Sequence, residues 1–341
     1  MTSPLTPLLL GFLVAFLLCA LPGKWAIGAL RKLGAKQNVS LDAPAAHSAK
    51  QGTPTMGGLL ILFSVMVCGW GYLLISRPAQ APDSHLFAVL LMMLFFGGIG
   101  FLDDYLSIKR GKNLGLRARE KMLAQLLLAV LFCVYLAKTS QPGWTTALSF
   151  ALPGGEKIVD IGVFYYLFLV LLIVGFSNAT NFTDGVDGLS SGVILLIALT
   201  IAVVTFALAP GIAFFCVALA GALTGFLWWN AHPAKMFMGD TGSLALGAGL
   251  ACAAAVGKRE IPLIIASLVC WAELLSVILQ VAVFQYRKKT KGLEFAKANR
   301  LFRRAPLHHH FEEAGWKETL VVARFWIAGA ICSVLALLWR V

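Results

Sequence analysis

Apolar residues fill ten segments of this chain, each near twenty residues long, and shorter polar stretches separate them. A helix of about twenty apolar residues crosses the ~30 Å hydrocarbon core of a bilayer. The pattern therefore predicts an all-α polytopic membrane protein, a single domain over 1–341 with about ten transmembrane helices. The predicted spans are 5–23, 56–76, 86–106, 122–138, 162–179, 188–208, 211–229, 241–257, 261–284 and 320–339.

Composition agrees with this pattern. Hydrophobic residues make up 59% of the chain and charged residues 13%, which is too apolar for an ordinary soluble domain. No polar connection is long enough to form a separate soluble domain. All seven cysteines fall inside apolar spans without a CxxC pair, so we expect buried thiols and not disulfides or metal ligands.

The basic residues are distributed unevenly between the connections. Those that follow the odd-numbered spans hold 21 of the 28 Lys and Arg residues. Because positive residues are retained on the cytoplasmic side, these connections are predicted to be cytoplasmic and both termini periplasmic. The net charge of +12 reflects this asymmetry, so membrane lipid is an expected partner and nucleic acid is not.

Two adjacent carboxylates, Asp103 and Asp104, end the apolar run of the third span. Acidic groups are costly near hydrocarbon and unfavourable at the C-terminus of a helix. We therefore expect a cation beside them, either a basic side chain or a metal ion. The alternative is a pair of solvated charges that marks the membrane exit.

Four further polar clusters fall on the predicted cytoplasmic side. They are KQGTPTMGG (50–58), NFTDGVDGL (181–189), NAHPAKMFMGDTGS (230–243) and APLHHHFE (305–312). Glycines and free N–H groups at a helix start suit a phosphate, and carboxylates suit Mg²⁺. Each cluster also has a structural explanation as a turn or a helix cap, and Asp240 is well placed as the N-cap of span 241–257. Three consecutive histidines point about 100° apart on a helix, so they do not share one metal ion.

Carboxylates, backbone amides, lysines and histidines on one membrane face are the parts of a metal-assisted phosphoryl transfer. A transporter more often has charges near the bilayer midplane, where Glu273 lies. An acid at that depth is either functional or a protonated, hydrogen-bonded packing residue, and we favour the second interpretation. The sequence predicts an enzyme that acts at the inner membrane surface on one soluble and one lipid substrate.

The same segments, together with LDDY (102–105), resemble the MraY family of phospho-N-acetylmuramoyl-pentapeptide transferases, in order and over essentially the whole chain. GTPTMGG and HHHFE distinguish this family from the wider superfamily of polyprenyl-phosphate sugar-1-phosphate transferases. The resemblance implies transfer of phospho-N-acetylmuramoyl-pentapeptide from its UDP donor to undecaprenyl phosphate. The products are lipid I and UMP, the cofactor is Mg²⁺, and the location is the bacterial cytoplasmic (inner) membrane. A homodimer is expected from the resemblance alone.

The resemblance also implies roles for individual residues. Asp240 is the first Mg²⁺ ligand, with Asp103 and Asp104 close to it, and Asp103 deprotonates or positions the lipid phosphate. His308 is the fourth catalytic candidate, for diphosphate contact or proton transfer. The substrate-binding candidates are Lys50, Thr55, Lys121, Asn181, Asp184, Asp187, Asn230 and His309.

Two features depart from the family pattern. Many relatives carry a Lys four residues after the first Asp of the pair, where this chain has Ser107, and the connection 287–304 is longer than usual. The alternatives left open are a relative that uses UDP-GlcNAc, an intramembrane prenyltransferase and a non-enzymatic membrane carrier. The residues do not distinguish a one-step transfer from a two-step route through an aspartyl intermediate.

Overall fold

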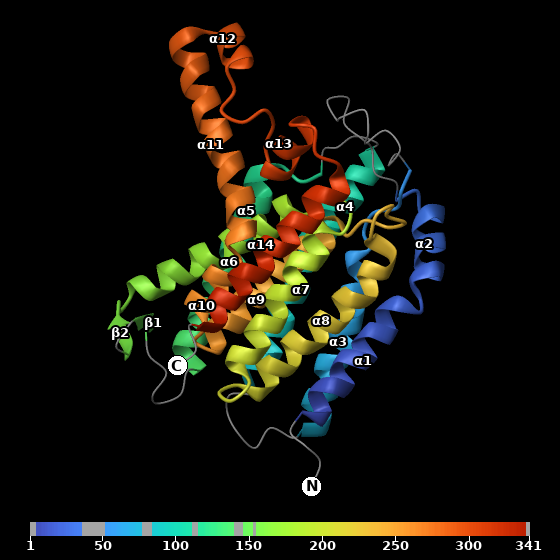
Figure 1. Ribbon diagram of the computed structural model, residues 1–341. Coiled ribbons are helices and arrows are strands. Elements are labelled where there is room, and N and C mark those ends of the chain that lie inside the picture. Colours follow the sequence, from blue (N-terminus) through green and yellow to red (C-terminus); the bar gives the residue numbers. More distant parts are fainter. Residues whose placement is uncertain are drawn as a thin grey trace.

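The computed structural model describes residues 5–35, 52–76, 84–110, 115–139, 146–152 and 155–338. They form a bundle of roughly parallel and antiparallel helices (Figure 1). The helices are α1 (Thr6–Ala20), α2 (Gly23–Lys32), α3 (Gly58–Ser76), α4 (Ser84–Arg110), α5 (Ala118–Thr139), α6 (Phe164–Thr183), α7 (Leu189–Thr205), α8 (Pro210–Asn230), α9 (Gly239–Val256), α10 (Glu260–Ala266), α11 (Leu268–Lys291), α12 (Leu293–Ala298), α13 (Leu307–Glu313) and α14 (Glu318–Leu338).

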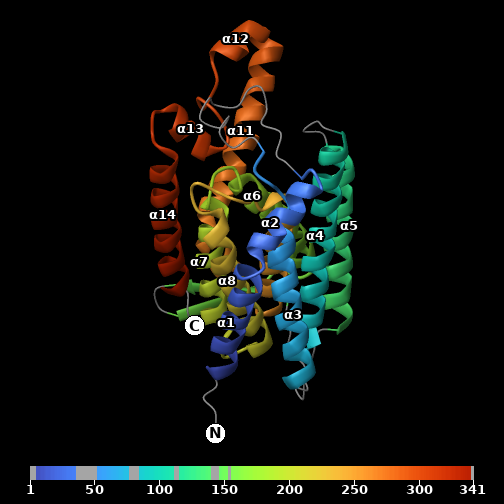
Figure 2. The ribbon, with the colours of Figure 1, turned by 90° about the vertical axis from the view of Figure 1, so that its right-hand side faces the viewer.

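The structure confirms the all-α polytopic prediction. Among the described residues, nine helical segments are long and apolar enough to cross a membrane, with α1 and α2 forming one of them. The shorter apolar helix α7 occupies the remaining predicted span, 188–208. The start of α1 and the end of α14 lie at the same end of the bundle, opposite α13 (Figures 1 and 2). The periplasmic location of the termini stays a prediction.

Two local features differ from the sequence prediction. A hairpin of two antiparallel strands, β1 (Ala147–Leu152) and β2 (Gly155–Asp160), lies in the connection between α5 and α6. The predicted span 261–284 is two helices, because the chain leaves helical geometry at Ser267. Helix α11 then continues past the predicted end and projects from the bundle with α12 (Figures 1 and 2).

Helix α9 lies at the centre of the bundle, with every residue from Thr241 to Ala255 buried. Its small residues allow neighbouring backbones to approach closely, as is common between membrane helices. A Cβ on Gly58 would lie 2.2 Å from the backbone nitrogen of Gly242, and one on Gly100 would lie 2.1 Å from the carbonyl oxygen of Asp240. These glycines fix α3 and α4 against the first turn of α9.

Candidate active site

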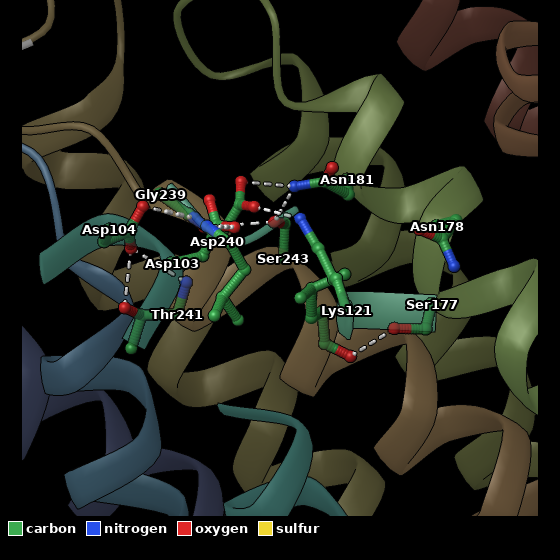
Figure 3. Close-up of polar contacts among 12 residues, drawn as sticks. Asp103, Asp104, Lys121, Ser177, Asn178, Asn181, Gly239, Asp240, Thr241 and Ser243 are labelled. Carbon is green, nitrogen blue, oxygen red and sulfur yellow. Dashed lines mark hydrogen bonds and ion pairs between the residues drawn. The ribbon is translucent and has the colours of Figure 1, made fainter. Parts of the chain in front are cut away.

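Four helix ends converge at the end of the bundle that also carries α13. The last turns of α4 supply Asp103 and Asp104, and the first turn of α5 supplies Lys121. The end of α6 supplies Asn181, and the first turn of α9 supplies Asp240 (Figure 3). The structure therefore brings close together the five residues named here, which the sequence assigned to one site.

Asp104 caps helix α9 from a distance of 136 residues in sequence. Its carboxylate accepts hydrogen bonds from the backbone N–H groups of Asp240 (3.2 Å) and Thr241 (3.0 Å) and from the Thr241 hydroxyl (2.6 Å). These donors include N–H groups that a helix leaves unpaired at its start. The prediction that Asp240 is the N-cap of this helix was therefore wrong. Met238 holds that position without a side-chain bond, and the carboxylate of Asp240 is left for other partners.

Asp240 is held by one cation and one amide. Lys121 Nζ forms an ion pair with its Oδ2, and Asn181 Nδ2 donates to its Oδ1 at 2.7 Å. Asn181 Nδ2 also donates to Ser243 Oγ at 2.9 Å (Figure 3). Because Lys121, Asn181 and Ser243 lie on three different helices, the orientation of the Asp240 carboxylate depends on the packing of all three.

Asp103 lies beside Asp240. Its Oδ1 accepts a hydrogen bond from the Leu116 backbone N–H at 3.0 Å, and its carboxyl group also contacts that of Asp240. A Cβ on Gly115 would lie 2.6 Å from the Asp103 carboxyl, so glycine is needed at this close approach. The segment before α5 thus fixes Asp103 beside Asp240.

Asp184, directly after α6, adds a fourth carboxyl group. Desolvation, followed by the negative charges of Asp240 and Asp104, raises the pKa of Asp184 to about 8, although the backbone N–H of Gly239 donates to it. Among the described side chains, these four carboxyl groups lie together with one ammonium group, that of Lys121, which pairs with Asp240. Because the acids outnumber this ammonium, the cluster needs either bound protons or a further cation.

The donor set fits Mg²⁺, which prefers carboxylate oxygens and waters. The carboxyl groups of Asp103, Asp184 and Asp240 lie in this cluster, and each oxygen of Asp240 has a side-chain partner. Asp104 instead accepts three hydrogen bonds from the start of α9. The Asp104 contacts are those of a positioning residue, and its predicted role as a metal ligand stays a prediction.

His308 and Glu273 form a fully buried pair. His308 Nδ1 lies 3.2 Å from Glu273 Oε2, and the His308 backbone N–H donates to Glu273 Oε1 at 3.2 Å. On its other side, His308 Nε2 lies against Gly185, whose Cβ would be 2.2 Å from that nitrogen. Glu273 therefore orients His308 toward the turn that carries Asp184. The buried Glu273 is hydrogen-bonded, in agreement with the favoured interpretation, and its partner is His308.

The other two histidines of the triplet have separate partners. His309 Nδ1 lies 2.7 Å from Glu312 Oε2, and burial lowers the pKa of His309. His310 Nδ1 accepts a hydrogen bond from the Arg303 backbone N–H at 3.1 Å. The prediction that the three do not share one ion is consistent with these contacts.

Asp187 belongs to a neighbouring cluster with His232 and Glu318. His232 Nδ1 and the Ala234 N–H both lie 3.0 Å from Asp187 Oδ2, and the Asp187 N–H donates to Glu318 Oε1 at 2.9 Å. These bonds join the turn after α6, the loop before α9 and the start of α14. Of the described residues, this is the trio whose possible ligand atoms all lie within 4.8 Å of one another.

Asn230, predicted to bind substrate, is buried and fully used inside the protein. Its Oδ1 accepts from the Gly188 N–H (3.1 Å) and from Ser191 Oγ (2.9 Å), and its Nδ2 donates to the Met236 carbonyl (3.0 Å). The geometry favours a positioning role, in which Asn230 ties the loop before Asp240 to the start of α7.

The segment that contains Thr55 crosses the start of α9. Phe237 N–H donates to the Pro54 carbonyl at 2.8 Å, and Gly58 N–H donates to the Met238 carbonyl at 2.9 Å. The Thr55 hydroxyl therefore lies beside Gly239 in the site. Lys50 lies outside the described residues.

Sequence comparisons place these features in a family. The glycosyl transferase family 4 model matches residues 86–258, and phospho-N-acetylmuramoyl-pentapeptide-transferase signature 1 matches residues 50–62. A relative of that name from Heliobacterium modesticaldum is 43% identical over 328 residues, covering 96% of each chain. Another from Desulforapulum autotrophicum is 41% identical over 346 residues, covering 96% of this chain and 90% of the relative. A third, from Oceanobacillus iheyensis, is 40% identical over 333 residues and 97% of each chain.

This chain belongs to the phospho-N-acetylmuramoyl-pentapeptide transferase family. The family 4 match contains every carboxylate of the aspartate cluster, and the signature covers the segment that crosses the start of α9. Glu273 and His308 lie outside both matches. The alignments with the three relatives cover 96–97% of this chain, so the resemblance extends beyond those two matches and includes α13, which carries the histidines.

Sequence reasoning missed several residues of this family member's site. Thr241 and Ser243 directly follow Asp240, and their polarity at a helix start was a usable signal. Glu318 and His232 gave no such signal, because each acts on Asp187 from a distant part of the chain. Their roles depend on tertiary contacts that no local pattern encodes.

Proposed function

We propose that this chain transfers phospho-N-acetylmuramoyl-pentapeptide from its UDP donor to undecaprenyl phosphate, giving lipid I and UMP, at the inner face of the bacterial cytoplasmic membrane. An oxygen of the lipid phosphate bonds to the phosphorus that carries the sugar. The bond from this phosphorus to the bridging oxygen of UMP breaks, and UMP leaves. Family membership supports the substrates, and the aspartate cluster at the end of the buried helix α9 supports the chemistry.

Mg²⁺ bound by Asp240, together with Asp103 and Asp184, would neutralise charge on the diphosphate and on the leaving UMP. Asp103, held by Leu116, takes a proton from the lipid phosphate or positions it. Lys121 breaks its ion pair with Asp240 and pairs with a substrate phosphate instead. Among the described side chains, its ammonium is the one cation that contacts the cluster.

His308 acts beside the turn of Asp184 and Gly185. Glu273 lies on its Nδ1 side, and its Nε2 side packs against Gly185 in the turn that carries Asp184. A histidine held in this way donates a hydrogen bond to a diphosphate oxygen or moves a proton near neutral pH. Thr55, Asn181 and His309 line the same end of the bundle as substrate contacts.

The observation that carries the proposal is the engagement of Asp240 by Lys121 and Asn181 beside Asp103. The test measures UMP released by purified full-length protein from UDP-N-acetylmuramoyl-pentapeptide. Release should require both undecaprenyl phosphate and Mg²⁺. Folded protein that releases no UMP under these conditions would overturn the proposal.

Two control arms separate the alternatives. A preference for UDP-GlcNAc over the pentapeptide donor would show that the chain uses UDP-GlcNAc as its donor substrate. Movement of donor across liposomes without UMP formation would indicate a carrier. We expect neither result.

A further inference from the structure

Helix α2 carries two lysines and a glycine on one exposed face. Lys24, Gly28 and Lys32 are spaced four residues apart, so they lie one above another along the helix. The opposite face is buried through Ile27 and Leu30, and Gly23 packs against the ring of Trp229. The two charges and the glycine are thus held in fixed positions relative to the bundle.

A cavity of about 460 Å³ that is open to the surface lies over this face. Lys24, Trp25, Gly28, Ala29 and Lys32 line it. A Cβ on Gly28 would meet no atom within 4 Å, so the space between the lysines is open at its floor. The lining therefore combines two cations at the ends, a gap at the centre and an aromatic ring at the side.

The position of α2 at one end of a membrane span favours an anionic lipid as the ligand. Helix α1, which forms a membrane span with α2, ends at Ala20, and α2 begins three residues later at Gly23. Trp229 Nε1 donates to the Ala20 carbonyl at 2.9 Å, which places this junction beside the loop that leads to Asp240. Trp25 is 74% exposed, as is typical of an aromatic residue at a lipid headgroup. Lysines at this level attract anionic lipids.

We propose that the α2 cavity binds the headgroup of an anionic phospholipid, with the phosphate between Lys24 and Lys32 above Gly28. Trp25 packs against the glycerol and the first methylenes of the acyl chains. The site is separate from the aspartate cluster, and it does not depend on the reaction proposed for the chain. Its chemical requirement is a phosphodiester with net negative charge and an attached apolar chain.

The experiment titrates the full-length protein in detergent with phosphatidylglycerol and counts bound lipids by native mass spectrometry. Gly28→Leu retains both charges and fills the gap, and Leu is a better helix former than Gly. Lys24→Gln with Lys32→Gln removes the charges and leaves the gap. Lys288→Gln with Lys289→Gln makes the same change of charge on the exposed end of α11 and serves as the matched control.

Gly28→Leu should weaken phosphatidylglycerol binding at least tenfold, and the α2 lysine pair about fivefold for each lysine removed. The α11 control should bind as the wild type does, and phosphatidylcholine should not replace phosphatidylglycerol. Unchanged binding by Gly28→Leu would overturn the site, because it would show attraction by charge alone. An equal loss in the α11 control, or displacement by inorganic phosphate as effectively as by lipid, would overturn it as well.

Discussion

The bundle buries carboxylates at both of its ends, but the two groups differ in their balance of charge. At the end near the hairpin, Glu260 accepts a hydrogen bond from Tyr165 Oη, and its Oε1 lies 3.3 Å from Lys258 Nζ. The Lys258 ammonium also lies over the Tyr165 ring, 4.0 Å from its centroid. Among the described residues, the Glu260 carboxylate thus has both an ammonium and a hydroxyl as partners.

At the other end, Asp103, Asp104, Asp184 and Asp240 lie together, and Lys121 pairs with Asp240. Burial of unbalanced charge is unfavourable, so this arrangement persists only with bound cations or protons. The two ends therefore differ in charge balance, and we expect the end with more acids than internal cations to be the one that takes part in turnover.

The largest expected effect is on the aspartate cluster. Asp240→Asn should lower the rate of UMP release on the order of 10³-fold, because it removes charge from the cation site and the partner of Lys121. Asp160→Asn, an exposed aspartate of β2, is the matched control and should retain normal turnover. If the two variants turned over at similar rates, the assignment of Asp240 would be wrong.

Glu273→Gln should lower kcat about ten- to a hundredfold, which is typical when the partner that orients a catalytic histidine is lost. Because the effect acts through His308, the pH profile of kcat should shift as well. A reduced rate with an unchanged pH profile would instead indicate a packing role for Glu273.

Lys121→Gln removes the positive charge that pairs with Asp240 and so tests the charge balance of the aspartate cluster. Without substrates, the variant should bind Mg²⁺ about tenfold more tightly, because Asp240 no longer pairs with an ammonium group. Its KM for the donor should rise, since a phosphate contact is lost. Isothermal titration calorimetry and steady-state kinetics measure the two effects, and weaker Mg²⁺ binding would contradict the arrangement.

Asp184 should make stability depend on pH. Its folded pKa of about 8 lies above the ordinary value of 3.8, so its contribution to stability is lost as pH rises between these values. Without divalent cations, the melting temperature of the wild type should fall from pH 5 to pH 9. Asp184→Asn should reduce that fall, and Mg²⁺ should oppose it in the wild type. Equal slopes for the two proteins would exclude Asp184 as the source.

The smallest effect on turnover is expected at the balanced end. Glu260→Gln removes the carboxylate that pairs with Lys258 and should lower stability by about 1–3 kcal/mol. Turnover per folded molecule should stay within about twofold, because this cluster lies at the opposite end of the bundle from the site (Figure 1). A loss comparable to that of Asp240→Asn would remove the distinction between the two ends.

The sequence alone determined the spans, the cluster of polar segments and the family, because these depend on local composition and on motifs. Transfer of a twenty-residue apolar segment into hydrocarbon is a property of that segment. The split at Ser267 and the strand hairpin were not predictable in the same way, since short elements depend on their neighbours.

Tertiary structure alone decided the partners of the site residues. Asp104 caps α9, Glu273 holds His308 and Glu318 holds the turn of Asp187, over separations of 137, 35 and 131 residues. Such contacts require helices to pack at specific distances, which Gly58 and Gly100 set here by allowing backbones to touch. The sequence therefore determined which groups the site contains, and the packing of the bundle determined what each of them contacts.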